Sequence, residues 1–199
     1  MVTDKKIELA DFRLLLKTVL ERFDPQRDLY IMNHTSQDPL DFTGEQMNRG
    51  SKAIWIGVGE PVRDLPFEYH EGDIAEIDQI EVFDCGCLVV SGASYENEPE
   101  LAERLLQRLR ARETSWPLVV LADHAAVTAH DQIAFLWTVF TRFNPAIDMY
   151  AAADVRQHHL AYSLPIVIDA RTKPGYPEEL FPSKEIVSLV DERWKSYFM

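Results

Sequence analysis

The apolar residues near the start of the chain recur with the spacing of a helix that buries one face. From residue 12 to residue 23 they fall at i, i+3, i+4, i+7, i+8 and i+11. Asp11 precedes them in the position of an N-terminal cap. Pro25 disfavours helical geometry at residue 24, and the continuous apolar run at 29–32 predicts a strand covered on both sides. The segment therefore predicts a helix, a turn and a strand. The apolar positions of the helix are Phe12, Leu15, Leu16, Val19, Leu20 and Phe23.

Residues 131–150 repeat residues 11–30 at a constant offset of 120 without a gap, and we call these segments the second and the first repeat. Nine of the twenty positions are identical, including the Arg, Pro, Asp and Tyr that follow the apolar stripe. Two unrelated amphipathic helices would share the stripe but not these residues, so the pattern predicts an internal duplication.

An apolar run at 118–121 precedes the second repeat and predicts a buried strand, which makes that unit strand, helix, strand. Before the first repeat only residues 1–3 occupy the equivalent place. We expect either that the chain is cut at this strand or that another segment supplies it.

Further strands are predicted at 53–58, 87–90 and 166–168, and a helix at 97–112 with Asn97 as its cap. A last helix is predicted from Ser183, and its apolar residues should be buried. The chain therefore predicts an α/β fold, with duplicated strand-helix-strand units around a mixed, largely parallel sheet and helices on both faces. We expect residues 1–115 and 116–199 to form two repeat units that pack as one compact body. The residues expected to be buried in the last helix are Ile186, Leu189, Val190, Trp194 and Phe198.

The composition is that of an ordinary globular protein, with 46% hydrophobic and 27% charged residues. A net charge of −13 disfavours nucleic acid and anionic membranes as partners. No apolar run approaches the roughly 20 residues that span a bilayer, and the N-terminus does not follow the order of a signal peptide. These features predict a cytoplasmic protein without membrane insertion, whose two cysteines are reduced.

The candidate chemical motifs each have a simpler structural explanation. His158 and His159 are adjacent and lack further ligands at metal spacing, so surface or hydrogen-bonded histidines are favoured over a metal site. Cys85 and Cys87 fit buried strand positions better than a zinc or redox site. The run at 50–52, Gly-Ser-Lys, could cradle an anion but is favoured as an ordinary turn. We therefore assign no catalytic, cofactor-binding or metal-binding residue to this chain.

Both repeats retain one oppositely charged pair, Arg22 with Asp28 and Arg142 with Asp148. Each pair either bridges its own turn, or the Arg caps the carbonyl groups at the helix end while the Asp holds turn amides. The alternative is two solvated charges.

Several segments resemble the C-terminal region of the UbiD decarboxylases. In that family an apolar strand ends in acidic residues, a helix carries a Trp and a terminal Thr-Arg, and a Pro-x-x-Asp turn leads to the next strand. The second repeat resembles this pattern closely, and most of the chain is covered. The matching segments are 3–28, 33–35, 38–42, 50–52, 121–148, 168–173 and 190–194. The long tail is similar to that of members assigned to menaquinone biosynthesis.

The resemblance implies a carboxy-lyase that decarboxylates aromatic or unsaturated acids with prenylated FMN, a divalent metal and potassium. Its catalytic and cofactor-binding motifs lie in N-terminal and central regions that this chain does not match. This chain would then be the domain that helps to build a homo-oligomer and closes one side of the cleft, and would be inactive alone. A free-standing binding or interaction module with the same fold is the competing hypothesis.

The loop at 33–42 is the segment that we expect nearest to the substrate of such an enzyme. It leaves the end of the strand at 29–32, and it combines two apolar side chains, Leu40 and Phe42, with the polar Asn33, His34 and Thr35. The alternative is a solvated loop whose two apolar side chains belong to the local core. The second repeat has 151–155, Ala-Ala-Ala-Asp-Val, in place of this element and is expected to be structural.

Overall fold

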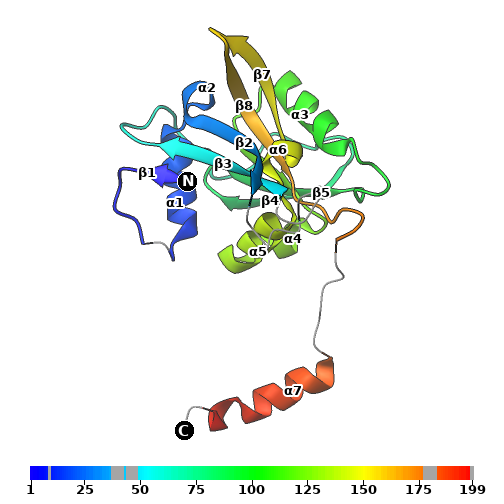
Figure 1. The fold of residues 1–199 in the computed structure, drawn as a ribbon. Coiled ribbons are helices and arrows are strands. Elements are labelled where there is room, and N and C mark those ends of the chain that lie inside the picture. The colour runs from blue at the N-terminus through cyan, green and yellow to red at the C-terminus, as the bar shows by residue number, and fades with distance from the viewer. Residues whose placement is uncertain (9, 37–42, 44–48, 177–182, 198–199) are drawn as a thin grey trace.

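A computed structural model describes residues 1–8, 10–36, 43, 49–176 and 183–197. Two mixed sheets and their covering helices form the body of the molecule, and one helix near the C-terminus stands away from it (Figure 1). The α/β expectation is confirmed, although the strands form two sheets instead of one.

The first repeat folds into helix α1 (Phe12–Arg22), the single-turn helix α2 (Pro25–Asp28) and strand β2 (Leu29–Ser36). The Asp11 carboxylate caps α1 as predicted, because it accepts a hydrogen bond from the Leu14 amide at 3.0 Å. Phe23 is fully buried at the end of α1 and stacks on Trp55 with ring centroids 4.9 Å apart.

Strand β2 belongs to a three-stranded sheet of order β1-β3-β2. Strand β1 (Val2–Thr3) is parallel to β3 (Arg49–Gly57), and β3 is antiparallel to β2 with Leu29 opposite Trp55. Residues 50–52 lie inside β3, so their assignment to a turn before the strand is wrong. They pair with β2, where Gly50 lies opposite Thr35 and Lys52 opposite Met32.

The second sheet has five strands in the order β4-β5-β6-β8-β7. The three central strands are parallel, and each edge strand is antiparallel to its neighbour. The strand bounds are β4 (Ile77–Asp84), β5 (Cys87–Gly92), β6 (Leu118–Leu121), β7 (Met149–Arg156) and β8 (His159–Asp169).

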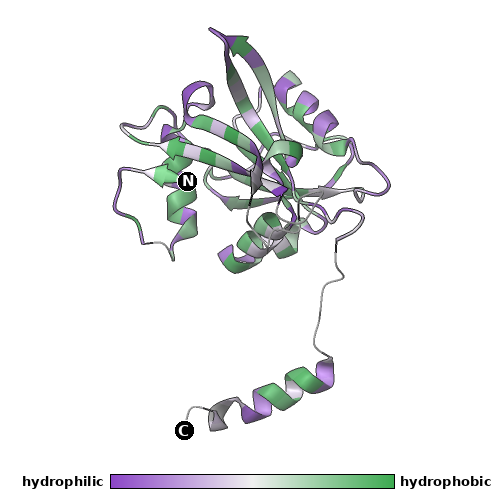
Figure 2. Ribbon diagram, in the orientation of Figure 1, coloured by the Kyte–Doolittle hydropathy of each residue, from purple (hydrophilic) through white to green (hydrophobic). Residues whose placement is uncertain are grey.

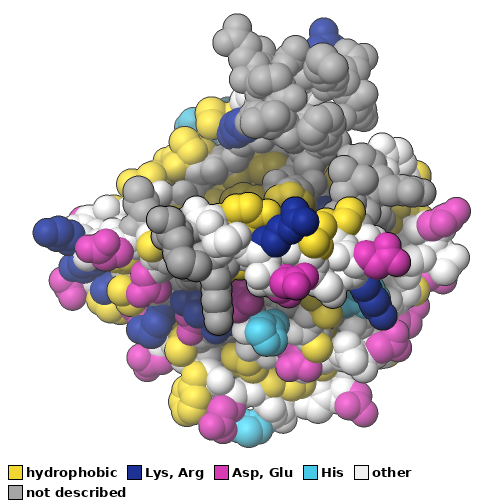
Figure 3. All heavy atoms as spheres, turned by 90° about the horizontal axis from the view of Figure 1, so that it is seen from below, with side chains coloured by type: hydrophobic (Ala, Val, Ile, Leu, Met, Phe, Trp, Pro, Cys, Tyr) yellow, Lys and Arg dark blue, Asp and Glu magenta, His cyan; other side chains and the backbone are white. Residues whose placement is uncertain are grey.

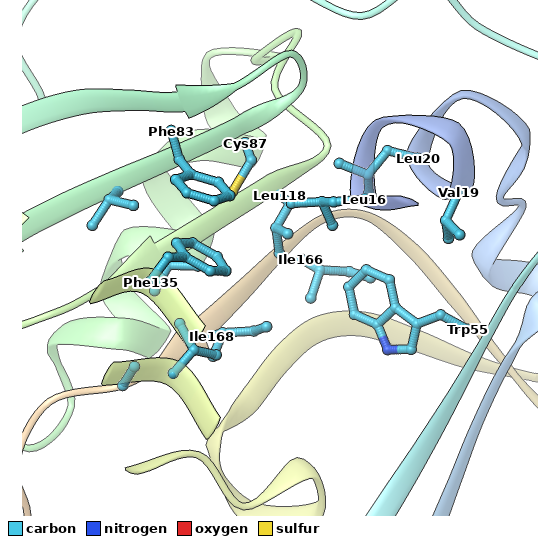
Figure 4. Packing of buried hydrophobic residues seen from close by; sticks show 14 of the residues in the cluster. Leu16, Val19, Leu20, Trp55, Phe83, Cys87, Leu118, Phe135, Ile166 and Ile168 are labelled. Carbon is cyan, nitrogen blue, oxygen red and sulfur yellow. The ribbon is translucent and has the colours of Figure 1, made fainter. Parts of the chain in front are cut away.

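Alternate side chains of the central strands enter two different cores, as strand geometry requires. On one face Leu118, Val120 and Ile166 pack with α1, the three-stranded sheet and α5 (Gln132–Arg142). Figure 4 shows Phe83 and Phe135 in this core, where their rings stack with centroids 3.8 Å apart. On the other face the even-numbered residues of β5 pack against helix α3 (Leu101–Ala111).

The second repeat has the same order of elements as the first. Helix α4 (Ala125–His130) precedes it, and α5, α6 (Pro145–Asp148) and β7 follow one another as α1, α2 and β2 do. In the first unit β1, which precedes the helix, is parallel to β3, and β3 is antiparallel to β2, which follows the helix. In the second unit β6, β8 and β7 pair in the same way. The duplication stays a prediction, and this shared order agrees with it.

Two helix predictions need correction. Asn97 does not cap α3, which begins at Leu101 after an N-cap residue, Glu100, whose side chain makes no capping bond. Pro99 disfavours helical geometry at residue 98, so the chain forms turns before the helix starts. The leucines of α3, namely Leu101, Leu105, Leu106 and Leu109, are buried.

Helix α7 (Lys184–Arg193) was expected to bury its apolar face, and it buries no residue in this chain. Ile186 is 54% exposed and Trp194 is 56% exposed. Figure 2 shows green and purple positions along the same helix, well apart from the body. Hydrophobic periodicity specifies that a helix has an apolar face but not which surface covers it. Phe198 lies outside the described residues, and no helix in the described segments is long and apolar enough to span a membrane.

Candidate functional site

The carboxyl ends of the parallel strands, where open α/β sheets place ligands, carry a network of buried charges. Asp169 ends β8, and its two carboxylate oxygens accept bonds from the Arg171 guanidinium at 2.9 and 2.7 Å. Both side chains are fully buried. Arg171 also donates to the carbonyl oxygens of Ala93 and Glu98 at 2.9 and 3.0 Å. The chain's own side chains thus fill this edge and join the loop after β5 to the loop after β8.

Lys173 extends the network to the second repeat. Its ammonium lies 3.2 Å from a carboxylate oxygen of Asp148 and donates to the carbonyl oxygens of Arg142 and Asp169. Burial raises the pKa of Asp148, and this outweighs the opposing effects of Lys173 and the Asn144 amide. Burial, together with the nearby Asp169, also raises the pKa of Tyr150 to about 12.

The retained Arg and Asp of each repeat have separate partners. Asp28 accepts a hydrogen bond from the Asp24 amide at 2.9 Å, while Arg22 donates to the Thr18 carbonyl at 2.9 Å. The first repeat therefore follows the second alternative, in which the Arg caps helix carbonyls and the Asp holds a turn amide. In the second repeat Asp148 likewise holds the amide of residue 144 at 2.7 Å.

Asn144 joins the second repeat to strand β3 and was not identified from the sequence. Its side-chain oxygen caps α6 by accepting from the Ala146 amide at 3.2 Å and also contacts the Ser51 hydroxyl. Ser51 accepts from the same amide at 2.8 Å, and the Asn144 amide group donates to the carbonyl of Thr43 at 3.2 Å. Both side chains are buried. The equivalent residue of the first repeat is Asp24, so the exchange of Asp for Asn between repeats was the available signal.

The predicted substrate-facing residues lie at the end of β2. Asn33 and His34 form an irregularity in the pairing with β3, and both are exposed. The His34 amide donates to the side-chain oxygen of Asn33 at 2.8 Å, and Thr35 is half-buried. Leu40 and Phe42 lie outside the described residues, so the functional role of this loop stays a prediction.

A cavity of about 610 Å³ lies between the two repeats, and we call it the central cavity. Its walls come from α1, β3, α5 and the strands β6 and β8. Figure 4 shows two of its aromatic side chains, Trp55 and Phe135, on either side of the strand residue Leu118. Most of the lining is apolar, including Phe12, Trp55, Phe135 and Phe140, and the polar residues Ser51 and Lys52 also line the cavity.

The remaining candidate motifs are structural. His158 and His159 are exposed around the turn between β7 and β8, as expected. Cys87 is buried in β5, but Cys85 is only half-buried in the turn before it, so the prediction of two buried strand cysteines is half wrong. Burial raises the pKa of both thiols. Among the described residues, no group of three or more His, Cys, Asp or Glu side chains could hold a metal ion.

The family model of the 3-octaprenyl-4-hydroxybenzoate carboxy-lyase C-terminal domain, UbiD_C, matches residues 1–57 and 59–170. This chain belongs to the UbiD family. A 4-hydroxybenzoate decarboxylase subunit of Chlamydia pneumoniae is 41% identical over 201 residues, which cover 100% of this chain and 33% of that protein. An uncharacterized protein of Chlamydia caviae is 37% identical over 206 residues, again 33% of its length. The chain thus spans about a third of the length of these UbiD relatives.

Two solved structures have weak overall similarity to this chain. The closed form of vanillic acid decarboxylase from Sedimentibacter hydroxybenzoicus has a TM-score of 0.44 and 12% identity, over 86% of this chain and 44% of that one. The evolved dimeric UbiD-class enzyme HmfF from Pelotomaculum thermopropionicum, solved in complex with prFMN, has a TM-score of 0.36 and 24% identity, over 53% and 22%.

Proposed function

We propose that this chain is the C-terminal assembly and cleft-closing domain of a larger carboxy-lyase. That enzyme would decarboxylate aromatic or unsaturated carboxylic acids with prenylated FMN, a divalent metal and potassium, all held outside this chain. We further propose that this enzyme is cytoplasmic and acts in quinone biosynthesis, in the menaquinone branch. Within this chain we propose two units, residues 1–115 and residues 116–199. The observation that carries it is the family match over most of a chain that spans a third of its relatives.

The charge network supports a catalytic centre outside this chain. At the sheet edge where a ligand would bind, Arg171 and Lys173 already neutralise Asp169 and Asp148. No buried side-chain nitrogen or oxygen atom in the described segments lacks a hydrogen-bond partner. These residues do not fit a flavin or a metal, because all of them are committed to internal bonds.

The outer face of α5 supports an assembly role. Ile133, Trp137 and Phe140 follow one another along this helix and are 75%, 65% and 58% exposed, and we call them the α5 ridge. The first repeat allows a comparison within the chain. Helix α1 has Arg13 and Lys17 at the positions that Ile133 and Trp137 occupy in α5. The two helices are related in sequence, yet α1 holds half-buried cations at these positions, with Arg13 over the Phe83 ring, where α5 leaves apolar side chains exposed. Exposed apolar patches of this kind mark interaction sites.

Helix α7 provides a matching apolar face, and its proposed partner is the α5 ridge of a second copy. Ile186 and Val190 of α7, and Trp194 at the start of the 3-10 helix η1 (Trp194–Ser196) that follows it, are spaced by about one helical turn and are exposed in their own chain. The two helices have similar lengths, 10 residues in α7 and 11 in α5. On the face seen in Figure 3, yellow hydrophobic side chains lie exposed between charged ones. In a two-fold dimer, α7 of each copy would pack on the α5 ridge of the other, so both apolar faces of both copies would be buried.

Analytical ultracentrifugation of the 199-residue chain tests the assembly role. We expect a dimer for the full chain, and a monomer both for a chain truncated after Tyr176 and for the Trp137→Asp variant. Phe67→Asp is the matched control, because Phe67 is 68% exposed but lies outside both helices. A monomeric full chain, or a control that dissociates as readily as Trp137→Asp, would overturn the proposed contact.

A second experiment separates the decarboxylase domain from a free-standing module. The chain alone should retain no stoichiometric prenylated FMN and release no carbon dioxide from aromatic acids. A full-length protein that contains it should do both, and Leu40→Ala and Phe42→Ala there should raise KM or change acid preference with little change in Tm. Stoichiometric flavin or turnover with the isolated chain would contradict the proposal, and an active enzyme unaffected by removal of the chain would favour the module.

A further inference from the structure

A groove of about 730 Å³ lies between strand β2 and the hairpin of β7 and β8, and we call it the β2–β8 groove. The hairpin extends beyond the body of the molecule (Figure 1). Four consecutive residues of each strand line the groove, residues 29–32 of β2 and residues 159–162 of β8. Successive side chains of a strand point to opposite faces, so a space that touches four in a row reaches across the edge of the strand. The groove therefore runs along two strand edges.

Within the described residues, neither edge is paired with another strand. Strand β2 pairs with β3 on one side only and ends its sheet. Strand β8 pairs with β7 on one side, whereas β6 covers its other edge only at residues 166–169. In the part of the chain that the structure describes, no backbone hydrogen bond joins residues 29–32 to residues 159–162. Because backbone N–H and C=O groups need partners, these edges can accept another strand.

The composition of these two edges differs from that of the other edge strands. Charged side chains on an edge strand discourage pairing with a further strand. The end strand β4 carries Asp78 and Glu81, and the end strand β7 carries Asp154. Residues 29–32 are Leu-Tyr-Ile-Met and residues 159–162 are His-Leu-Ala-Tyr, so neither run has an Asp, Glu, Lys, Arg or Pro. The edges that border the groove thus lack the residues that keep an edge unpaired.

The two sides of the groove are tied together at one end. The Arg156 guanidinium near the tip of the hairpin donates to the side-chain oxygen of Gln26 in α2 at 2.7 Å, and both residues line the groove. This bond connects the hairpin to the helix that precedes β2, so the two edges are positioned before a partner binds. Tyr30, Ile54 and Leu160 also line the groove and are 53%, 36% and 58% exposed. A partner that covers them removes apolar surface from water.

We propose that the β2–β8 groove binds an extended segment of the larger UbiD-family protein, from the part that lies outside this chain. The segment adds as a strand between β2 and β8, about 4.8 Å from each, and so connects the two sheets. This chain spans about a third of the length of its relatives, so most of such a protein can supply the segment. The charged end strands of this chain make a second copy a poor donor of that strand. The inference rests on the proposed function only in that the chain works within a larger protein.

Synthetic peptides of about 12 residues, long enough for one whole strand, test the inference. They tile the part of the full-length protein outside this chain, and the 199-residue chain is titrated against each by fluorescence anisotropy. We expect saturable one-to-one binding of peptides from one contiguous stretch and no binding of its scrambled version. Hydrogen–deuterium exchange should show new protection at residues 29–32 and 159–162 in the complex. Tyr30→Asp and Leu160→Asp place a carboxylate against the bound segment, and each should raise the Kd at least about tenfold.

Val155→Asp is the matched control, because Val155 lies opposite Leu160 in the hairpin and is 67% exposed but does not line the groove. It should leave the Kd unchanged, and thermal melts should show that both hairpin variants fold alike, while Tyr30→Asp tests the opposite edge independently. The assay measures neither flavin nor turnover, so its failure is distinct from a failure of the proposed decarboxylase function. No saturable binding, an equal loss of affinity in Val155→Asp, or protection confined to other residues would overturn the inference.

Discussion

Lys173→Met is the substitution for which the structure makes the sharpest stability prediction. The Asp148 side chain is 3% exposed and that of Lys173 is 12% exposed, so their contact is shielded from solvent. Removing one partner of a buried ion pair leaves an uncompensated charge and costs about 3 to 5 kcal/mol. Asp148 keeps one bond from the Asn144 amide, and we therefore expect about 3 kcal/mol at pH 7.

The pH dependence separates this explanation from simple loss of packing. The pKa of Asp148 is raised above 3.8 in the folded chain, so the folded state binds more protons than the unfolded state just above that pH. Stability from this group is therefore lost as pH rises through the folded pKa. Lys173→Met removes a cation that lowers the pKa of Asp148, so the pKa of Asp148 in the folded variant should be higher still. The pH range in which the folded state binds more protons than the unfolded state should then extend to higher pH. The destabilisation should shrink as the pH is lowered into that window, because the carboxyl becomes neutral.

Urea unfolding at pH 7 and at about pH 5 measures the effect through linear extrapolation. In an Asp148→Asn background, Lys173→Met should cost only about 1 kcal/mol, because no buried carboxylate is left unpaired. Asp28→Asn is the control from the first repeat. Burial raises the pKa of Asp28, but bonds from Arg27 and the Asp24 amide outweigh it and lower the pKa. Its contribution should therefore be lost as pH falls, in the opposite direction. A cost of Lys173→Met that does not change with pH would refute the reasoning.

Three further predictions follow from burial and bonding. Phe23→Ala should lower the free energy of unfolding by about 3 to 5 kcal/mol, and Phe143→Ala by less, because Phe143 is only half-buried; calorimetry that reverses this order would contradict the packing. Ser51→Ala should cost about 1 to 3 kcal/mol in urea titrations through its lost bonds to the second repeat, and Ser51→Thr should restore part of it. A thiol reagent such as dithionitrobenzoate should modify Cys85 slowly and Cys87 only after unfolding, since Cys87 is fully buried; labelling of Cys87 in the folded chain would argue against that burial.

The elements predicted correctly are those that local patterns determine. The cap at Asp11, the stripe of α1 and the buried run at 118–121 each depend on residues a few positions apart. Strand β4 was missed, because it is an edge strand whose pattern of alternating exposure contains Asp78, Gln79 and Glu81. Residues 50–52 are held in β3 by pairing with 32–35 of β2, and the local pattern of a Gly-Ser-Lys run does not reveal that partner.

The candidate sites were harder to predict because they depend on which surfaces remain uncovered. The sequence indicated an apolar face on the last helix, and the structure leaves that face exposed. The central cavity is lined by segments that lie far apart in the sequence, such as Trp55 and Val139. A comparison of equivalent positions in the two repeats, such as Lys17 with Trp137, could have revealed from the sequence that α5 carries an apolar surface that α1 lacks.

The distribution of charge explains why an acidic substrate would need residues outside this chain. A carboxylate requires uncommitted donors and a local excess of positive charge. At the sheet edge Asp169 neutralises Arg171, and Asp148 neutralises Lys173, while both cations also spend their N–H groups on backbone carbonyl oxygens. The chain as a whole carries a net charge of −13, which repels an anion further. The α5 ridge and the exposed face of α7 are apolar instead. Under the proposed function these surfaces would serve docking and closure, and the charged end of an acidic substrate would be held by another part of the larger enzyme.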